Sequence, residues 1–168
     1  MNVRLQFLLR TGIGSMEFVA LITWFVTAAV GICLLAIWLV EYDHKDAATR
    51  LPRTVVSAHA VLALAGLVVW SAYLTSDSSR LAWTAILVLA VVMLLGLTMA
   101  VRWIGVYRAH QTPAAVLVPF GARGADSLTP APVPPERNLP VPVVVAHGLL
   151  AAATVVLVLL TALDVAGS

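Results

Sequence analysis

The chain has 168 residues, of which 61% are hydrophobic and only 11% are charged, with a mean hydropathy of +1.00. Soluble domains carry about 25% charged and about 45–50% apolar residues. A chain of this length has too little interior to hide so many apolar side chains from water. The composition therefore excludes a soluble enzyme, a secreted disulfide scaffold and a disordered tail. A net charge of +2 and a single cysteine, Cys33, give no sign of a nucleic-acid-binding surface or of an intrachain disulfide.

Four stretches of the chain contain no Asp, Glu, Lys or Arg. A helix needs ~20 apolar residues to cross a ~30 Å hydrocarbon core, where open backbone groups find no partner. We therefore predict an all-α integral membrane protein with a single four-helix membrane domain, whose spans lie at about 17–40, 54–76, 81–103 and 140–163. The segment 1–10 is expected to lie along the membrane surface, unless it is a frayed tail. The five tryptophans lie mostly toward span ends, as rings at the membrane interfaces do.

The stretch 104–139, between the third and fourth spans, is rich in proline. Its run 130–135 should be extended and polyproline-like rather than helical. The segment 116–120 is apolar enough to lie back on the helices. The alternative is that the whole stretch is a solvated linker.

Basic residues are divided unequally between the two sides of the predicted membrane domain. The side with both chain ends and the turn at 77–80 holds three of the ten Lys and Arg residues, and the side with the loops after the first and third spans holds seven. The positive-inside rule places those loops, including 104–139, in the cytoplasm and both termini outside. The preference for Arg over Lys indicates a GC-rich bacterial genome, so we expect a bacterial cytoplasmic membrane.

A pattern repeats between the second and fourth spans. The motif L-P-x-x-V-V-x-A-H occurs at 51–59 and again, 88 residues later, at 139–147. A fainter motif, G-x6-W-x3-Y, begins at Gly31 and, 65 residues later, at Gly96. These matches predict a duplicated helical hairpin with a pseudo-twofold axis along the membrane normal, because two-helix repeats keep the same direction. The alternative is chance similarity among apolar sequences.

Each copy of the first motif ends in a histidine, His59 or His147, seven residues after a helix-starting proline. Seven helical residues rise ~10 Å, so both histidines should lie at matched depth in the membrane, where an ionisable residue is a functional candidate. Two facing imidazoles can supply both axial ligands of a haem iron, whereas zinc and copper sites usually need three or four ligands. We therefore predict one haem b bound by this pair.

Other residue types near the histidines favour a flat cofactor. Small side chains follow on the same helix faces, four and seven residues later, and arginines near the membrane surface suit haem propionates. The predicted cofactor-binding residues are His59, His147, Ala63, Gly66, Ala151, Thr154, Arg53 and Arg102. The alternative is that the small residues only let helices approach closely and that each histidine forms an interhelical hydrogen bond worth ~1 kcal/mol.

Four spans with two ligand-like histidines, His59 and His147, resemble the four-helix membrane b-type cytochromes and the cytochrome anchor subunits of respiratory enzymes. The resemblance implies an electron carrier rather than an enzyme, working with a quinone or a larger respiratory membrane complex. The chain also resembles four-span membrane proteins of high-GC Gram-positive bacteria, a likeness that implies no function.

Two other functions remain open on the residues alone. The first is a cofactor-free accessory subunit that packs in a larger membrane complex through the loop 104–139. The second is a small transporter. Its grounds are weaker, because only Glu17 offers a coupling charge and it lies at a span end. Expected partners are the lipid bilayer and other membrane proteins, a second copy of the chain included, but no nucleic acid.

Overall fold

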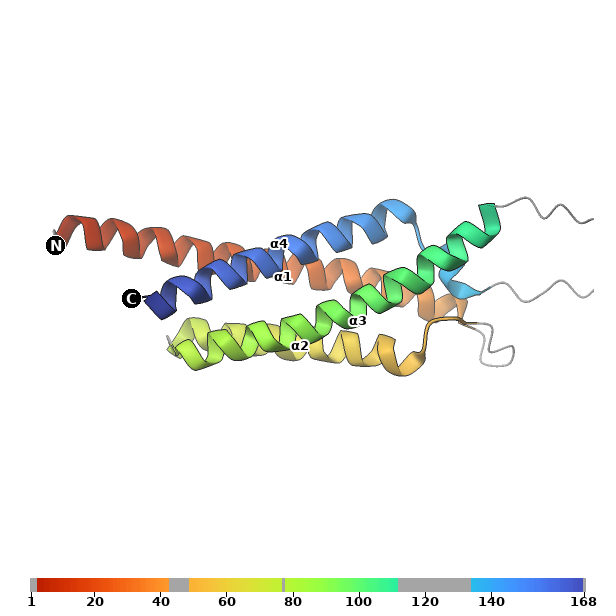
Figure 1. Ribbon diagram of the computed structural model, residues 1–168, viewed down its shortest axis with the longest axis horizontal. Helices are drawn as coiled ribbons and strands as arrows, with labels where there is room; N and C mark the ends of the chain where they lie inside the picture. The colour runs from red at the N-terminus through yellow and green to blue at the C-terminus, as the bar shows by residue number, and fades with distance from the viewer. Residues whose placement is uncertain (1–2, 43–48, 77, 112–133, 168) are drawn as a thin grey trace, which may run out of the picture.

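The computed structural model describes residues 3–42, 49–76, 78–111 and 134–167. Its helices are, in chain order, α1 (Val3–Glu41), α2 (Arg53–Ser76), α3 (Ser79–Gln111), the short 3₁₀ helix η1 (Pro135–Asn138) and α4 (Val141–Gly167) (Figure 1). Each of the four α-helices is long and apolar enough to cross a membrane. The predicted all-α architecture with four membrane-spanning helices is confirmed at this level.

A proline immediately precedes two of the helices, as the repeated motif predicts. In α2 the carbonyl of Pro52 accepts hydrogen bonds from the amides three and four residues on, at 2.9 and 3.1 Å, and in α4 the carbonyl of Pro140 does the same at 3.0 and 3.1 Å. Proline suits this position because the first amides of a helix lack intrahelical partners, so a missing N–H costs nothing there. The two histidine-bearing helices therefore begin in the same way.

Two helices extend beyond the predicted spans. α3 continues to Gln111, into the stretch predicted to be loop, and η1 lies near the end of that stretch. Charged residues end a hydrocarbon-crossing segment but not a helix, and no proline occurs between the start of α3 and Pro113. α1 begins at Val3, so residues 3–10 of the segment expected along the membrane surface belong to one continuous helix. The predictions for 116–120 and for most of the proline run lie outside the described residues.

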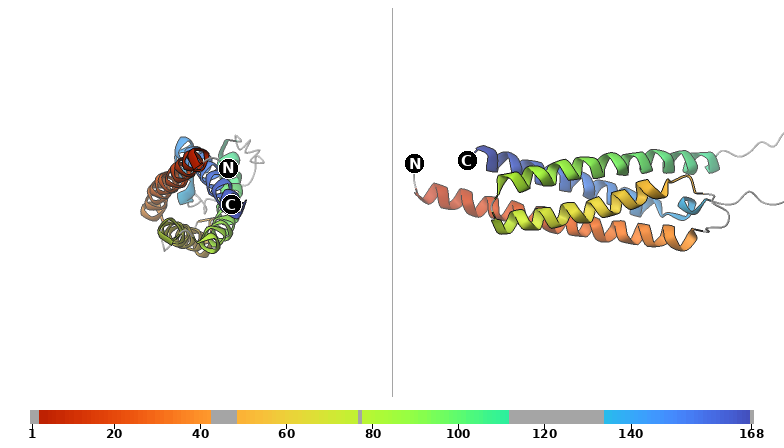
Figure 2. Two further views of the ribbon diagram at one scale, coloured as in Figure 1. Left: turned by 90° about the vertical axis from the view of Figure 1, so that its left-hand side faces the viewer. Right: turned by 90° about the horizontal axis from the view of Figure 1, so that it is seen from below.

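The helices pack as two close pairs. α2 packs mainly against α3, and α1 packs mainly against α4, while α1–α2 and α3–α4 contacts are fewer. α2 and α4 therefore occupy opposite corners of the bundle, as do α1 and α3 (Figure 2). Side chains of α2 and α4 can meet only across the centre of the bundle.

Two clusters of buried side chains fill the bundle, one toward each end. The cluster nearer the chain termini includes Trp24 and Trp70, and the cluster nearer the loops includes Trp38. Four of the five tryptophans are buried, and only Trp83 is exposed, at 40%. The wide apolar rings of the four buried tryptophans fill the space between helices rich in small residues. Their location at the membrane interfaces stays a prediction.

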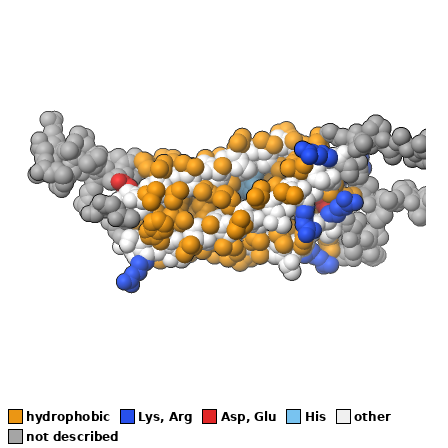
Figure 3. All heavy atoms as spheres, viewed as in Figure 1, with side chains coloured by type: hydrophobic (Ala, Val, Ile, Leu, Met, Phe, Trp, Pro, Cys, Tyr) orange, Lys and Arg blue, Asp and Glu red, His pale blue; other side chains and the backbone are white. Residues whose placement is uncertain are grey.

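Large apolar side chains cover the outside of the bundle, and charged side chains lie at its two ends (Figure 3). Lys and Arg gather mainly at the end that carries the loops. An exposed apolar belt of this length suits contact with lipid tails rather than water.

Candidate functional site

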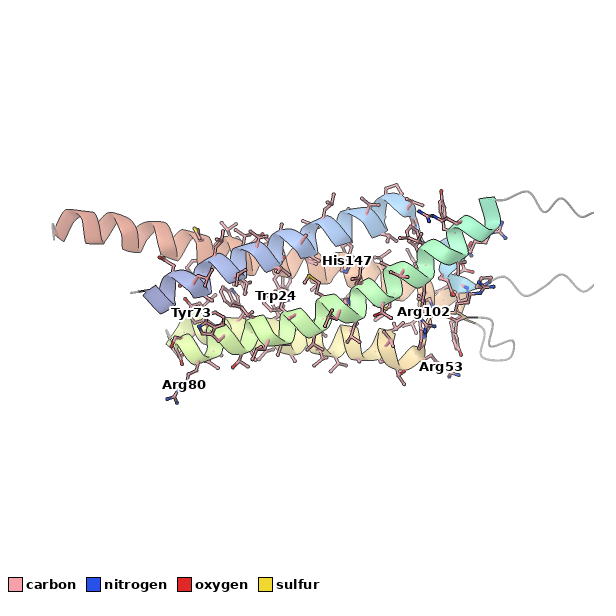
Figure 4. The ribbon with its side chains drawn as sticks, in the orientation of Figure 1. Trp24, Arg53, Tyr73, Arg80, Arg102 and His147 are labelled. Atoms are coloured by element: carbon pink, nitrogen blue, oxygen red, sulfur yellow. The ribbon has the colours of Figure 1, made fainter. Side chains whose placement is uncertain are left out.

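His59 of α2 and His147 of α4 meet across the centre of the bundle. Their ring centroids are 6.3 Å apart, and their ring planes are inclined at 65°. Both side chains are partly buried, and Figure 4 shows His147 between the two ends of the bundle. The structure thus brings together the two residues that the sequence predicts at matched depth.

His147 is positioned by α1. Its Nδ1 lies 3.1 Å from the carbonyl oxygen of Thr27, and a Cβ added at Gly31 would lie only 3.0 Å from Cε1 of the ring. Helical Cα–Cβ bonds tilt toward the N-terminus, so a side chain at position 31 would cover the carbonyl four residues earlier. Glycine leaves this carbonyl open to a second donor besides the helix's own N–H.

His59 is positioned by α3 in the same way. Its Nδ1 lies 2.9 Å from the carbonyl oxygen of Val92, and a Cβ at Gly96 would lie 3.0 Å from its Cε1. Gly31 and Gly96 are the glycines of the fainter sequence motif. The sequence repeats the histidine after 88 residues and the glycine after 65 residues. In the structure each histidine contacts one of these glycines, so the two repeats form two equivalent contacts.

These hydrogen bonds decide which ring nitrogen is available to a ligand. A carbonyl oxygen only accepts, so Nδ1 of each ring carries the hydrogen and Nε2 keeps its lone pair. Metal-binding histidines commonly donate their second ring N–H to such a carbonyl. With their centroids 6.3 Å apart, the two imidazoles would be close enough to contact the same metal ion.

His59 and His147 could together supply two ligands to a metal. Among the described residues there is no group of three or more His, Cys, Asp or Glu side chains that could hold a metal ion. The donor set therefore fits a haem, whose porphyrin supplies the other four ligands, better than a bare zinc or copper ion.

Three of the small residues predicted beside the histidines lie on the following turns of α2 and α4. Ala63 and Ala151 are partly buried. Gly66 is buried beneath the indole of Trp24, where a Cβ would lie 2.8 Å from Cζ2 of that ring. A side chain of α1 therefore fills the space beside Gly66.

Thr154, the fourth small residue, is also in contact with α1. It is fully buried, and its hydroxyl lies 3.3 Å from the hydroxyl of Thr27. The same Thr27 whose carbonyl holds His147 therefore contacts the next turn of α4 as well. Both residues seven positions after the histidines, Gly66 and Thr154, pack against α1.

Arg53 and Arg102, the predicted partners of haem propionates, lie at the loop end of the bundle (Figure 4). The guanidinium carbon of Arg53 is 5.3 Å from the centroid of the Tyr42 ring, a cation–π arrangement. Nη1 of Arg102 donates to the carbonyl of Arg50 at 3.2 Å. Both arginine side chains are exposed, and six helical residues, ~9 Å of rise, separate Arg53 from His59.

A buried carboxylate at the loop end is not predicted by any sequence pattern. Glu136 in η1 is fully buried, and its two oxygens accept hydrogen bonds from the Thr49 hydroxyl at 3.1 Å and from the Arg50 amide at 2.5 Å. These bonds join η1 to the segment before α2. A glutamate in a proline-rich loop is typical of a solvated residue, and only the fold brings it to partners so distant in sequence.

A second polar pair lies at the opposite end of the bundle. The hydroxyl of Tyr73 in α2 donates a hydrogen bond to the carboxylate of Glu17 in α1. The Tyr73 ring is fully buried, with its centroid 4.8 Å from that of Trp70. Glu17, at the end of its span, thus helps to join α1 to α2.

Fold and site together define a multi-pass, four-helix membrane protein with a histidine pair in its interior. Comparison with known families, curated proteins and solved structures finds no match to the chain. Function is therefore inferred from the geometry of the site.

Proposed function

We propose that this chain is a small integral membrane subunit that binds one haem b through His59 and His147 and carries electrons to or from a quinone or a larger respiratory membrane complex. The observation that supports this most directly is the pair of imidazoles 6.3 Å apart, each with its Nδ1 bound to a backbone carbonyl. When bound there, haem b supplies a one-electron redox centre.

The protein's part in this function is to hold two imidazoles ready in an apolar interior. Each carbonyl sets the tautomer of its histidine and raises the basicity of Nε2. Gly31 and Gly96 allow these bonds, because any side chain there would press on the rings. His59 and His147 would together hold the haem, which would supply electron transfer rather than chemistry on a bound substrate. We therefore assign no catalytic residue.

The proposal includes a duplicated hairpin. The pair α1–α2 would be related to α3–α4 by a pseudo-twofold axis along the membrane normal. Support comes from the equivalent histidine contacts and from two stacked ring pairs at corresponding positions. The ring centroids of Trp38 and Tyr42 are 5.1 Å apart, and those of Trp103 and Tyr107 are 5.6 Å apart.

The proposed location is a bacterial cytoplasmic membrane, with both termini outside. It is supported by the seven of ten basic residues on the side of the first and third loops. Among the described residues, the space-filling view in Figure 3 has most Lys and Arg side chains at that end.

A cofactor-free accessory subunit is the second candidate, and one observation favours it. The Nδ1 atoms of His59 and His147 already join α2 to α3 and α4 to α1. Interhelical bonds of this kind stabilise a membrane bundle by ~1 kcal/mol each. In this candidate function the histidines only hold the helix pairs together.

A reduced-minus-oxidised absorbance spectrum separates the two candidates. The full chain is expressed with ample haem and purified in detergent. We expect a haem b signal at one haem per chain, which His59→Ala and His147→Ala should each abolish because both axial ligands are needed. Helicity by circular dichroism and a monodisperse gel-filtration peak show whether each variant is folded.

His44→Ala and His110→Ala are the matched controls, since these histidines lie outside the predicted spans. Both should retain the full signal. A folded wild-type protein without a Soret band would end the electron-carrier proposal and leave the accessory subunit in its place.

A further inference from the structure

An open groove lies at the loop end of the bundle, on the outer surface between the start of α2 and the end of α3. It has a volume of about 550 Å³ and is lined by Thr49, Arg50, Pro52, Val101, Arg102 and Gly105. A Cβ added at Gly105 would meet no atom within 4 Å, so the space above this residue is empty. The groove is separate from the histidine pair.

The charge of the groove is positive. Arg50 and Arg102 are both exposed, and the bond from Arg102 Nη1 to the Arg50 carbonyl holds the two residues together. The nearby carboxylate of Glu136 is fully buried, and its hydrogen bonds are to the Thr49 hydroxyl and the Arg50 amide. In the described part of the chain, neither guanidinium has a carboxylate within ion-pair distance. The groove is therefore suited to an anion.

The position of the groove indicates which anion it meets. The membrane-crossing parts of α2 and α3 reach Arg53 and Arg108, so the groove lies at the level where lipid headgroups begin. Val101, one wall of the groove, is 62% exposed and continues an apolar stripe on α3 through Leu97 and Leu94, which are 61% and 63% exposed. A cationic groove above an exposed apolar stripe matches a molecule with a phosphate and an acyl chain.

We propose that this groove binds an anionic phospholipid of the adjacent leaflet, with its phosphate between Arg50 and Arg102 and an acyl chain along the stripe of α3. Basic pockets between transmembrane helices bind acidic lipid headgroups by the same combination of charge and apolar contact. The site gives Arg102 an anionic partner on the outer surface of the bundle. This proposal does not depend on haem binding.

Native mass spectrometry of the full chain from mixed phosphatidylglycerol and phosphatidylcholine tests the site. The wild-type protein should retain phosphatidylglycerol in preference to phosphatidylcholine. Each of Arg50→Gln and Arg102→Gln should weaken that retention about fivefold, since one basic residue near an anionic surface contributes on the order of 1 kcal/mol. Gly105→Leu should also weaken it by placing a side chain in the groove, where an added Cβ would meet nothing within 4 Å.

Arg80→Gln is the matched control, because Arg80 is an exposed arginine at the opposite end of the bundle (Figure 4). It should retain phosphatidylglycerol like the wild type, and so should His59→Ala, whatever its haem content. Equal retention by the wild type, the Arg50 and Arg102 variants and Gly105→Leu would overturn the proposal. Displacement of the lipid by millimolar inorganic phosphate would also overturn it, because the site would then recognise free phosphate without the acyl chain.

Discussion

The two histidines are held alike, but the turns beside them are packed differently. His59 contacts α3 and His147 contacts α1, each through a carbonyl bond and a glycine four residues further on. On the next turns, Gly66 lies under the Trp24 indole, whereas Thr154 meets the hydroxyl of Thr27. Both imidazoles therefore have the same kind of carbonyl and glycine contact, but the side chains packed on the following helix turns differ.

This difference distinguishes the contacts that position the two imidazoles from the contacts that only fill space between the helices. A buried carbonyl that accepts a second hydrogen bond needs a glycine at the right position, so this contact allows few substitutions. The space beside position 66 or 154 needs only atoms of about the right volume. We therefore expect the largest effects from changes at the glycines that face the histidines.

Gly31→Leu and Gly96→Leu should have the largest effect, and an equal one in both halves. A Cβ at either position lies 3.0 Å from an imidazole carbon, so the ring must move away from its carbonyl. We expect most of the haem content to be lost and the protein to be destabilised by ~1–3 kcal/mol. The haem-to-protein ratio and thermal unfolding in detergent measure the two effects.

Gly148→Leu is the control for these variants. This glycine follows His147 directly, but a Cβ there would meet nothing within 4 Å. It should keep its haem and its unfolding temperature. If the Gly31 and Gly96 variants behaved like Gly148→Leu, the rings would not depend on these glycines.

Gly66→Leu should cost a similar amount of stability but less haem content, because it displaces the Trp24 indole rather than an imidazole. A Cβ at position 66 lies 2.8 Å from the indole, and overpacking of this kind costs ~1–3 kcal/mol. In the double variant with Trp24→Ala, the leucine should fill part of the cavity, so the loss of stability should be smaller than the sum of the single losses. Additive losses in a thermal double-mutant cycle would show that the two residues do not share this space.

Thr154→Val should have the smallest effect. It removes the hydroxyl contact with Thr27 at nearly constant side-chain volume, which should lower the free energy of unfolding by ~0.6 kcal/mol. Haem content should not change, because His147 bonds to the Thr27 carbonyl rather than to its hydroxyl. Thr84→Val is the control, since Thr84 also bonds to the carbonyl four residues back but is exposed. A fall in haem content would place the hydroxyl pair in the cofactor site.

Much of the site could be predicted from the order of the residues. Proline and histidine are rare in apolar sequence, so their shared spacing of seven in two helices indicates equal depth. The contact partners could not be predicted in the same way. That Gly31 serves His147 and Gly96 serves His59 depends on the close pairing of α1 with α4 and of α2 with α3.

The four apolar helices, and the prolines that precede α2 and α4, could be predicted from the amino-acid sequence alone. Each segment forms a helix for a reason that does not depend on the other helices. A polar side chain or a backbone group without a hydrogen bond is unfavourable in lipid whatever its neighbours. The helix pairs, the burial of four tryptophans and the hydrogen bonds of Glu136 to Thr49 and Arg50 depend on how the helices pack together. Helices in a membrane are sorted by close fit and hydrogen bonds across their interfaces, because lipid is as apolar as their side chains. Such a fit brings together residues that are far apart in the chain, so it cannot be predicted from hydropathy along the chain.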